Sequence, residues 1–156
     1  MTSDVTIIKP SGDEGVWKIF IPIDPVPASR PRITRAGWAY YGKRYTKFRK
    51  EASSLLSAAD IPIEFPLSGL LAVSAVFTVV PPKTTKRKSP RGDVDNYFKT
   101  LDVLNEIVWE DDDQLVLSVS SKVFGNHSGI DLEVAKIERV PKARTLSEMW
   151  FARQPR

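Results

Sequence analysis

The chain has 156 residues, of which 23 are Lys or Arg and 19 are Asp or Glu, giving a formal net charge of +4, and 42% are hydrophobic. This length predicts one domain with a proper core and excludes a disordered chain. There is no cysteine, which excludes disulfides, thiolate zinc sites and cysteine nucleophiles. No apolar run approaches the roughly 18 residues of a membrane span and no signal-like segment is present, so we expect a cytoplasmic protein without membrane contact.

The charges are segregated along the chain. Residues 25–50 carry eight basic side chains and no acid, and residues 81–92 carry five basic side chains and no acid. Residues 93–113 then carry eight acids and a single base, Lys99. Because like charges at this density repel, the acidic segment must fold beside the basic ones, hold cations or stay solvated.

The first half of the chain predicts a strand, a long loop and a helix. We expect a flexible N-terminus over residues 1–15 and then a strand over residues 16–23, where apolar residues alternate. Pro and Gly punctuate the following residues, which predicts an ordered loop with a hairpin around Gly42. Its aromatic and basic residues interleave, a mixture that either stacks on bases or pins the loop to the core. A helix capped by Thr46 is expected to run through Ala59.

The second half predicts alternating strands and one further helix. Residues 69–80 are apolar on both alternations, as in a central strand covered on both faces. A basic loop over residues 81–92 precedes a helix over residues 94–108, whose polar stripe holds Asp95, Lys99, Asp102 and Glu106.

The last two predicted strands follow an acidic turn. One begins near residue 115 and points Leu115, Leu117 and Val119 inward, and the other runs over residues 129–140 after a turn at residues 125–129. Residues 16–140 thus form the predicted domain, and residues 141–156 form a basic C-terminal arm.

Carboxylates are the plentiful reactive groups. The single histidine, His127, lies in a predicted turn. With one histidine and no cysteine, the chain has few side chains for a histidine triad or a zinc site. Asp93 and Asp95 flank the helix start and Asp111 to Asp113 precede the next strand, so these two groups meet only if the helix packs back across the sheet. If they meet, a divalent cation would relieve their repulsion, and Lys99 would lie beside it. Helix capping, a solvated turn and an ordinary Asp95–Lys99 surface pair explain the same residues without a metal.

The order of these residues resembles a known family. Residues 92–99 read GDVDNYFK, residues 101–105 read LDVLN and residues 108–116 read VWEDDDQLV. This order resembles the RusA family of Holliday junction resolvases, whose signature is D-x-D-N-x-x-K, then D-A-L-N, then D-D-x-Q followed by Val or Ile. PASRPR at residues 27–32 and YT at residues 45–46 extend the resemblance, which spans residues 16–138.

The resemblance implies a fold, an activity and a set of functional residues. It implies an α+β fold with a mixed sheet of about four to five strands and two main helices. It also implies a homodimeric endodeoxyribonuclease, often carried by phages, that nicks four-way DNA junctions symmetrically with Mg²⁺, or Mn²⁺, and no organic cofactor. The implied catalytic residues are Asp93, Asp95, Lys99 and Asp112. The implied metal ligands are Asp93, Asp95 and Asp112, with Asp111 in support or, since the acidic run is one residue longer than the signature needs, in place of Asp112.

The basic segments fit DNA binding. We expect seven side chains to follow the phosphate backbone: Arg30, Arg32, Arg35, Lys86, Arg87, Lys88 and Arg91. Two other readings stay open. A nucleic-acid-binding module without catalysis needs only these loops. A transferase using D-x-D is disfavoured because the chain lacks a glycine-rich phosphate loop.

Overall fold

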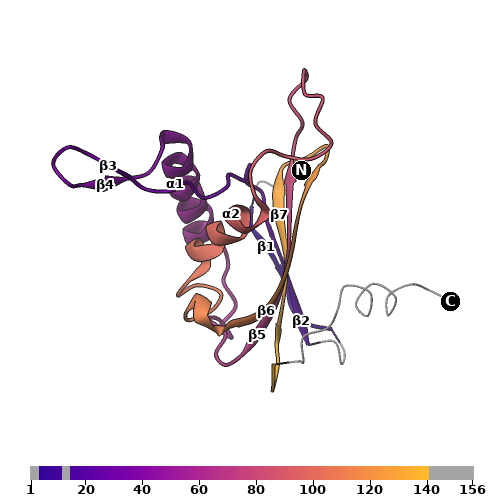
Figure 1. The fold of residues 1–156 in the computed structure, drawn as a ribbon. Helices are drawn as coiled ribbons and strands as arrows, with labels where there is room; N and C mark the ends of the chain where they lie inside the picture. Colours follow the sequence, from indigo (N-terminus) through magenta and orange to yellow (C-terminus); the bar gives the residue numbers. More distant parts are fainter. Residues whose placement is uncertain (1–3, 12–14, 141–156) are drawn as a thin grey trace.

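A five-stranded mixed sheet with helices on one face organises the molecule (Figure 1). The computed structural model describes residues 4–11 and 15–140, so the expected C-terminal arm lies outside the described residues. The sheet order is β1-β2-β7-β5-β6, and β5 pairs parallel with β6 but antiparallel with β7. The α+β class and the sheet size predicted from the sequence are confirmed. The strands of this sheet are β1 Thr6–Ile8, β2 Val16–Ile21, β5 Leu71–Val79, β6 Leu115–Phe124 and β7 Gly129–Lys136.

The N-terminal elements differ from the prediction in three places. β1 lies within the segment expected to be flexible and pairs antiparallel with β2. The hairpin expected at Gly42 lies earlier and consists of β3 Arg32–Ile33 and β4 Ala39–Tyr40. The helix α1 Lys43–Ala58 begins at the N-cap Gly42, so the predicted cap at Thr46 is wrong. Thr46 instead donates a hydrogen bond from its hydroxyl to the Gly42 carbonyl, 3.2 Å away, inside the first turn.

The predicted helix over residues 94–108 is shorter and tighter than expected. It consists of α2 Val94–Phe98 and the 3-10 helix η2 Lys99–Leu104. The buried Thr100 hydroxyl donates to the Tyr97 carbonyl at 2.6 Å, an i to i−3 contact, and Glu106 beyond the helix has a φ of 65°. The predicted polar stripe therefore ends at Asp102.

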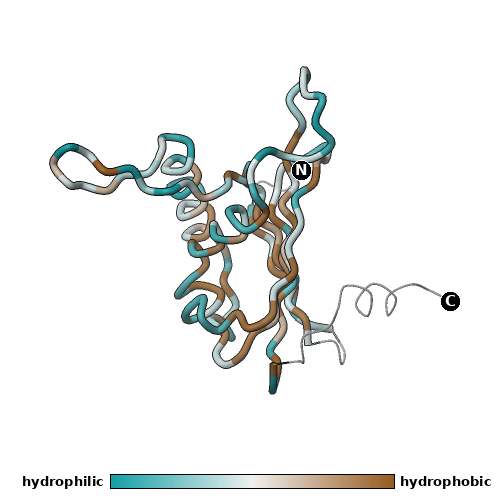
Figure 2. Tube along the Cα trace, viewed as in Figure 1, coloured by the Kyte–Doolittle hydropathy of each residue, from teal (hydrophilic) through white to brown (hydrophobic). Residues whose placement is uncertain are grey.

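One face of the sheet carries the core, and no helix of the described residues covers the other (Figure 1). Phe77 of β5, Leu104 and Trp109 are fully buried between the sheet and the helices, where Figure 2 shows hydrophobic residues concentrated. The helix-free face bears Leu117 and Val119 of β6, which are 39% and 47% exposed. Two predictions are therefore wrong: β5 is not covered on both faces, and Leu117 and Val119 do not point inward. Their register explains this, since they pair with Ala72 and Ser74, which alternate with the buried residues of β5.

The parallel pairing of β5 with β6 positions the acidic residues. Parallel neighbours need a crossover, and residues 80–114 provide it with the basic loop, α2, η2 and the short 3-10 helix η3 Asp112–Gln114. The crossover runs back along the sheet from the end of β5 to the start of β6. Asp112 thus lies beside the start of β6, whereas Asp93 follows Gly92, whose carbonyl Lys122 contacts farther along β6. Among the described residues, no helix is both long and apolar enough to cross a membrane.

Candidate functional site

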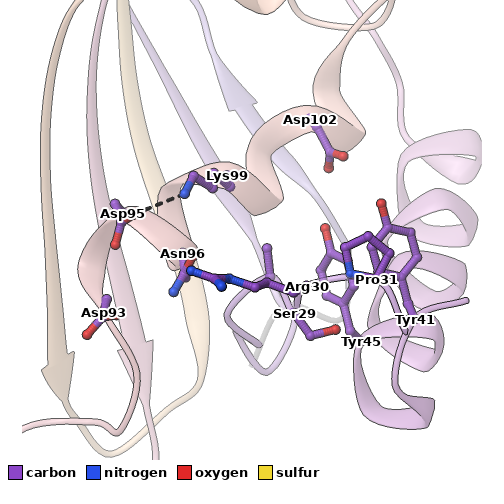
Figure 3. A pocket seen from close by; sticks show the side chains of 11 residues that line it. Ser29, Arg30, Pro31, Tyr41, Tyr45, Asp93, Asp95, Asn96, Lys99 and Asp102 are labelled. Carbon is purple, nitrogen blue, oxygen red and sulfur yellow. Dashed lines mark hydrogen bonds and ion pairs between the residues drawn. The ribbon is translucent and has the colours of Figure 1, made fainter. Parts of the chain in front are cut away.

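A pocket of about 470 Å³ lies at the start of α2 (Figure 3). Its walls come from two distant parts of the chain, the loop after β2 with the start of α1, and the α2–η2 segment. The residues that line it are Ala28, Ser29, Arg30, Pro31, Tyr41, Tyr45, Asp93, Asp95, Asn96, Lys99 and Asp102. Three predicted catalytic residues, Asp93, Asp95 and Lys99, are therefore brought together.

The start of α2 is fixed by contacts around Gly92. The ammonium of Lys122 in β6 donates hydrogen bonds to the carbonyls of Pro90 and Gly92. Gly92 has a φ of 100°, and a Cβ there would lie 3.0 Å from Cγ of Pro27. Because an L side chain rarely adopts this φ and has no room, glycine is required where the basic loop enters the site.

The loop after β2 is tied directly to α2. The backbone N–H of Ala28 donates to the Asn96 carbonyl at 2.7 Å. Figure 3 shows Arg30 extending across the pocket toward Asn96. A guanidinium thus faces the side of the pocket that holds Asp93 and Asp95, an arrangement suited to a bound phosphate.

The two carboxylates at the start of α2, those of Asp93 and Asp95, have different partners. Asp93 is the N-cap of α2 by position, but its side chain makes no capping hydrogen bond. Asp95 accepts a hydrogen bond from the Lys99 ammonium at 3.0 Å. This hydrogen bond lowers the pKa of the Asp95 carboxyl below its usual range. The capping explanation for Asp93 thus lacks its defining contact, and Asp95 and Lys99 act as a charge pair inside the pocket.

Asp102 and Ser29 carry orphaned polar atoms. Among the described residues, only Ser29 Oγ and Asp102 Oδ1 are buried side-chain polar atoms without a hydrogen-bond partner, and both residues line this pocket. Burial raises the pKa of Asp102, against the effect of the Arg49 guanidinium 3.5 Å from Oδ2. Because an unsatisfied buried polar group destabilises the fold, such atoms in one pocket indicate a ligand site.

The acidic turn has a structural role in the chain. Asp111 accepts a hydrogen bond from the Asp113 N–H at 3.0 Å, and the Gln114 side chain accepts one from the Asp111 N–H at 2.9 Å, forming a capping box. Gln114 also donates to the carbonyls of Leu67 and Gly69. Asp111 and Asp112 do not line the pocket. A hydrogen bond with Asp111 and the charges of Asp111, Asp102 and Asp113 raise the pKa of the exposed Asp112.

The donor chemistry of the pocket fits a hard divalent cation. Carboxylate and amide oxygens are the ligands that Mg²⁺ takes, and Asp93, Asp95, Asn96 and Asp102 supply them. Within residues 4–11 and 15–140, however, no three acidic or histidine side chains lie close enough together to hold a metal as they stand. Because the crossover runs back along the sheet, Asp112 does not line the pocket with Asp93. The Asp95 carboxylate is hydrogen-bonded to Lys99.

The predicted DNA-binding residues lie in four places. Arg30 lines the acidic pocket, and Arg32 and Arg35 are exposed on the β3–β4 hairpin. Lys86 and Lys88 are exposed on the basic loop. Arg87 and Arg91 line a second pocket of about 490 Å³ together with Arg44, Pro27 and Gly92. The acidic pocket and this basic pocket thus adjoin each other at residues 92 and 93.

Several residues that line the acidic pocket were not among the predicted site residues. Ser29 and Asn96 stand inside the quoted PASRPR and GDVDNYFK strings, which could have signalled them. Tyr41 and Tyr45 belong to the aromatic residues singled out in the loop, and Asp102 matches the acid of D-A-L-N. His127 is exposed on the turn after β6 and lines neither pocket.

Comparison with known proteins agrees with this geometry. No curated protein sequence matches the chain. The family model described as endodeoxyribonuclease RusA matches residues 22–135, which include both walls of the acidic pocket and the capped acidic turn. Since the match covers well over half of the sequence, the chain belongs to the RusA endodeoxyribonuclease family.

Proposed function

We propose that this protein is a Mg²⁺-dependent endodeoxyribonuclease that resolves four-way DNA junctions by paired, symmetric nicks. The observation that carries the proposal is the acidic pocket, which adjoins the basic pocket. The acidic pocket brings together Asp93, Asp95, Asp102, Lys99 and Arg30. An acidic pocket next to basic surfaces is the arrangement that a metal-assisted phosphodiester hydrolase needs.

The residues of the pocket divide into two roles. Asp93 and Asp95 would hold the cation, with Asp112 assigned as the third acid from its motif position. When bound, the cation polarises the scissile phosphate and makes a coordinated water more acidic. Arg30 contacts the phosphate, and Lys99 offsets the negative charge that develops on it. We assign products with a 5′-phosphate and a 3′-hydroxyl.

A homodimer suits this substrate. A four-way junction presents two symmetry-related strands, and a twofold dimer presents two identical sites to them. We assign the dimer contact to the helix-free face of β5 and β6, where Leu117, Val119 and Val123 are 39 to 47% exposed. Apolar side chains gathered on a sheet face that the described chain leaves uncovered favour contact with a second copy.

The test measures cutting of end-labelled four-way junction, duplex and single-stranded DNA in Mg²⁺ and in EDTA. We expect paired nicks confined to the junction and dependent on Mg²⁺. Asp95→Asn should abolish cutting while junction binding persists or tightens, because a carboxylate ligand is lost together with a negative charge near the DNA. Asp60→Asn, which removes an exposed carboxylate outside the pocket, should cut like the wild type. If Asp95→Asn still cuts, the site assignment is wrong.

The second candidate is a branched or single-stranded nucleic-acid-binding module without catalysis. The separation of Asp112 from Asp93 and Asp95 favours it, because the described side chains form no ready metal cluster. Junction binding without cutting in either Mg²⁺ or Mn²⁺ would select this reading.

A further inference from the structure

The β3–β4 hairpin, residues 32–40, is exposed along its whole length. Every residue from 30 to 41 is exposed, and the two strands form their own sheet, separate from the five-stranded one. Figure 1 shows the hairpin projecting away from the body of the molecule. A two-stranded ribbon has little stability of its own, so core packing does not account for its aromatic residues.

The turn of this hairpin presents Trp38 to solvent. The Thr34 N–H donates to the Trp38 carbonyl at 2.9 Å, and the Trp38 N–H donates to the Thr34 hydroxyl at 3.1 Å. Gly37 supplies a φ of 83°, which the turn needs. The Trp38 side chain is 75% exposed. A large aromatic ring that a structured turn keeps exposed to solvent indicates a binding surface.

The chemistry around Trp38 selects the ligand. Arg32 and Arg35 lie on the hairpin and Arg30 at its base, and residues 25–50 contain no acid. Arg32 also pairs across the hairpin with Tyr40, which is 47% exposed. Flat aromatic rings among arginines fit a ligand that combines negative phosphates with flat bases, which is a nucleic acid.

Both ends of the hairpin enter the acidic pocket. Ser29, Arg30 and Pro31 lead into β3, Tyr41 follows β4, and all four line the pocket. A DNA strand whose phosphate lies in the pocket therefore has its neighbouring bases within the region of the hairpin. In continuous duplex those bases are stacked on each other, whereas at a branch point they are open to a protein ring.

We propose that Trp38 stacks on a base exposed at the branch point, and that this contact selects branched DNA over continuous duplex. The proposal rests on the proposed function, because it places the scissile phosphate in the acidic pocket. The hairpin is then a specificity element that reads the structure of the DNA, while the arginines beside it hold phosphates without regard to sequence.

The test compares affinities for an immobile four-way junction and for continuous duplex of the same sequence, by fluorescence anisotropy in EDTA. In Trp38→Ala, the ratio of junction to duplex affinity should fall about tenfold, the order expected for loss of one aromatic stacking contact. Trp38→Phe should restore most of that ratio, because phenylalanine still stacks. Ile63→Ala, which removes a 97% exposed apolar side chain elsewhere, should keep the wild-type ratio.

The outcomes separate this inference from the proposed function. If Trp38→Ala keeps the wild-type ratio, or if Trp38→Phe loses as much as Trp38→Ala, the stacking role is wrong. If the wild type binds the junction selectively through Trp38 but cuts nothing in Mg²⁺ or Mn²⁺, the nuclease proposal fails and the stacking role stands. Melting temperatures of all variants should match the wild type, since Trp38 and Ile63 are exposed.

Discussion

At the scale of single residues, Lys99 pairs with Asp95 in the structure and is proposed to face a phosphate when DNA is bound. In the structure its ammonium lies 3.0 Å from the Asp95 carboxylate. During cleavage it would face a phosphate instead, while Asp95 turns to the cation. Both side chains of this pair are 63 to 64% exposed, and the hydrogen bond lowers the pKa of the Asp95 carboxyl.

The first prediction at this scale concerns the pKa of Asp95. Lys99→Met removes the hydrogen bond that depresses it, so the pKa should rise toward its ordinary value. The Asp95 carboxylate would then take up its proton at a higher pH than in the wild type. An NMR titration of the Asp95 carboxyl carbon measures this shift, with Lys47→Met as the control. An unchanged Asp95 pKa in Lys99→Met would show that the ion pair does not persist in solution.

At the element scale, α2 is placed by the backbone that precedes it. Three side chains hold the residues just before Asp93. The Lys122 ammonium donates to the Pro90 carbonyl, and the Tyr97 hydroxyl donates to the Arg91 carbonyl at 2.9 Å. The Pro27 ring lies beside Gly92. The basic loop is therefore anchored at its last residues, where it joins the acidic pocket.

Gly92→Ala tests this anchoring. The substitution adds strain at a φ of 100° and a contact at 3.0 Å with Pro27, so we expect a loss of about 2–3 kcal/mol of stability and weaker cutting. Gly69→Ala is the matched control, because Gly69 has a φ of 84° but open space around its Cβ position. It should cost about 1 kcal/mol. Urea denaturation measures both, and equal losses would remove Pro27 from the explanation.

Some helices and strands could be predicted from the sequence and others could not. Periodicity located β2, because burial on one face leaves a regular alternation, and a continuous apolar run located β5. Periodicity could not foresee the 3-10 geometry of residues 99–104, in which the Thr100 hydroxyl donates to the Tyr97 carbonyl. Nor could it foresee where the acids lie, because that depends on the parallel pairing of two strands separated by a 35-residue connection, residues 80–114.

The sequence motif predicted some of the residues that line the pocket, but not their surroundings. Motif order placed Asp93, Asp95 and Lys99 in one segment, and in the structure all three line the same pocket. It could not show that Ser29 and Asp102 are left with unpaired polar atoms, because burial of single atoms has no signature in sequence. The position of Asp112 outside the pocket likewise follows from the crossover and not from the motif.

At the scale of the whole molecule, the apolar helix-free face sets the expected assembly. Val119→Lys places a charge among Leu117 and Val123, so the dimer dissociation constant should rise about a hundredfold, as for an interface hot spot. Sedimentation equilibrium measures it, and Ile63→Lys is the control at a distant exposed position. A Val119→Lys protein that dimerises like the wild type would exclude this face as the interface.

The place of β7 in the sheet has a consequence for how the enzyme is made. β7 follows every other described strand in the sequence, yet it lies between β2 and β5 and pairs with both. The pocket takes one wall from the loop after β2 and the other from the connection after β5. Before β7 is added, β2 and β5 have no strand between them, so the sheet joins these two halves of the pocket only through the last described strand.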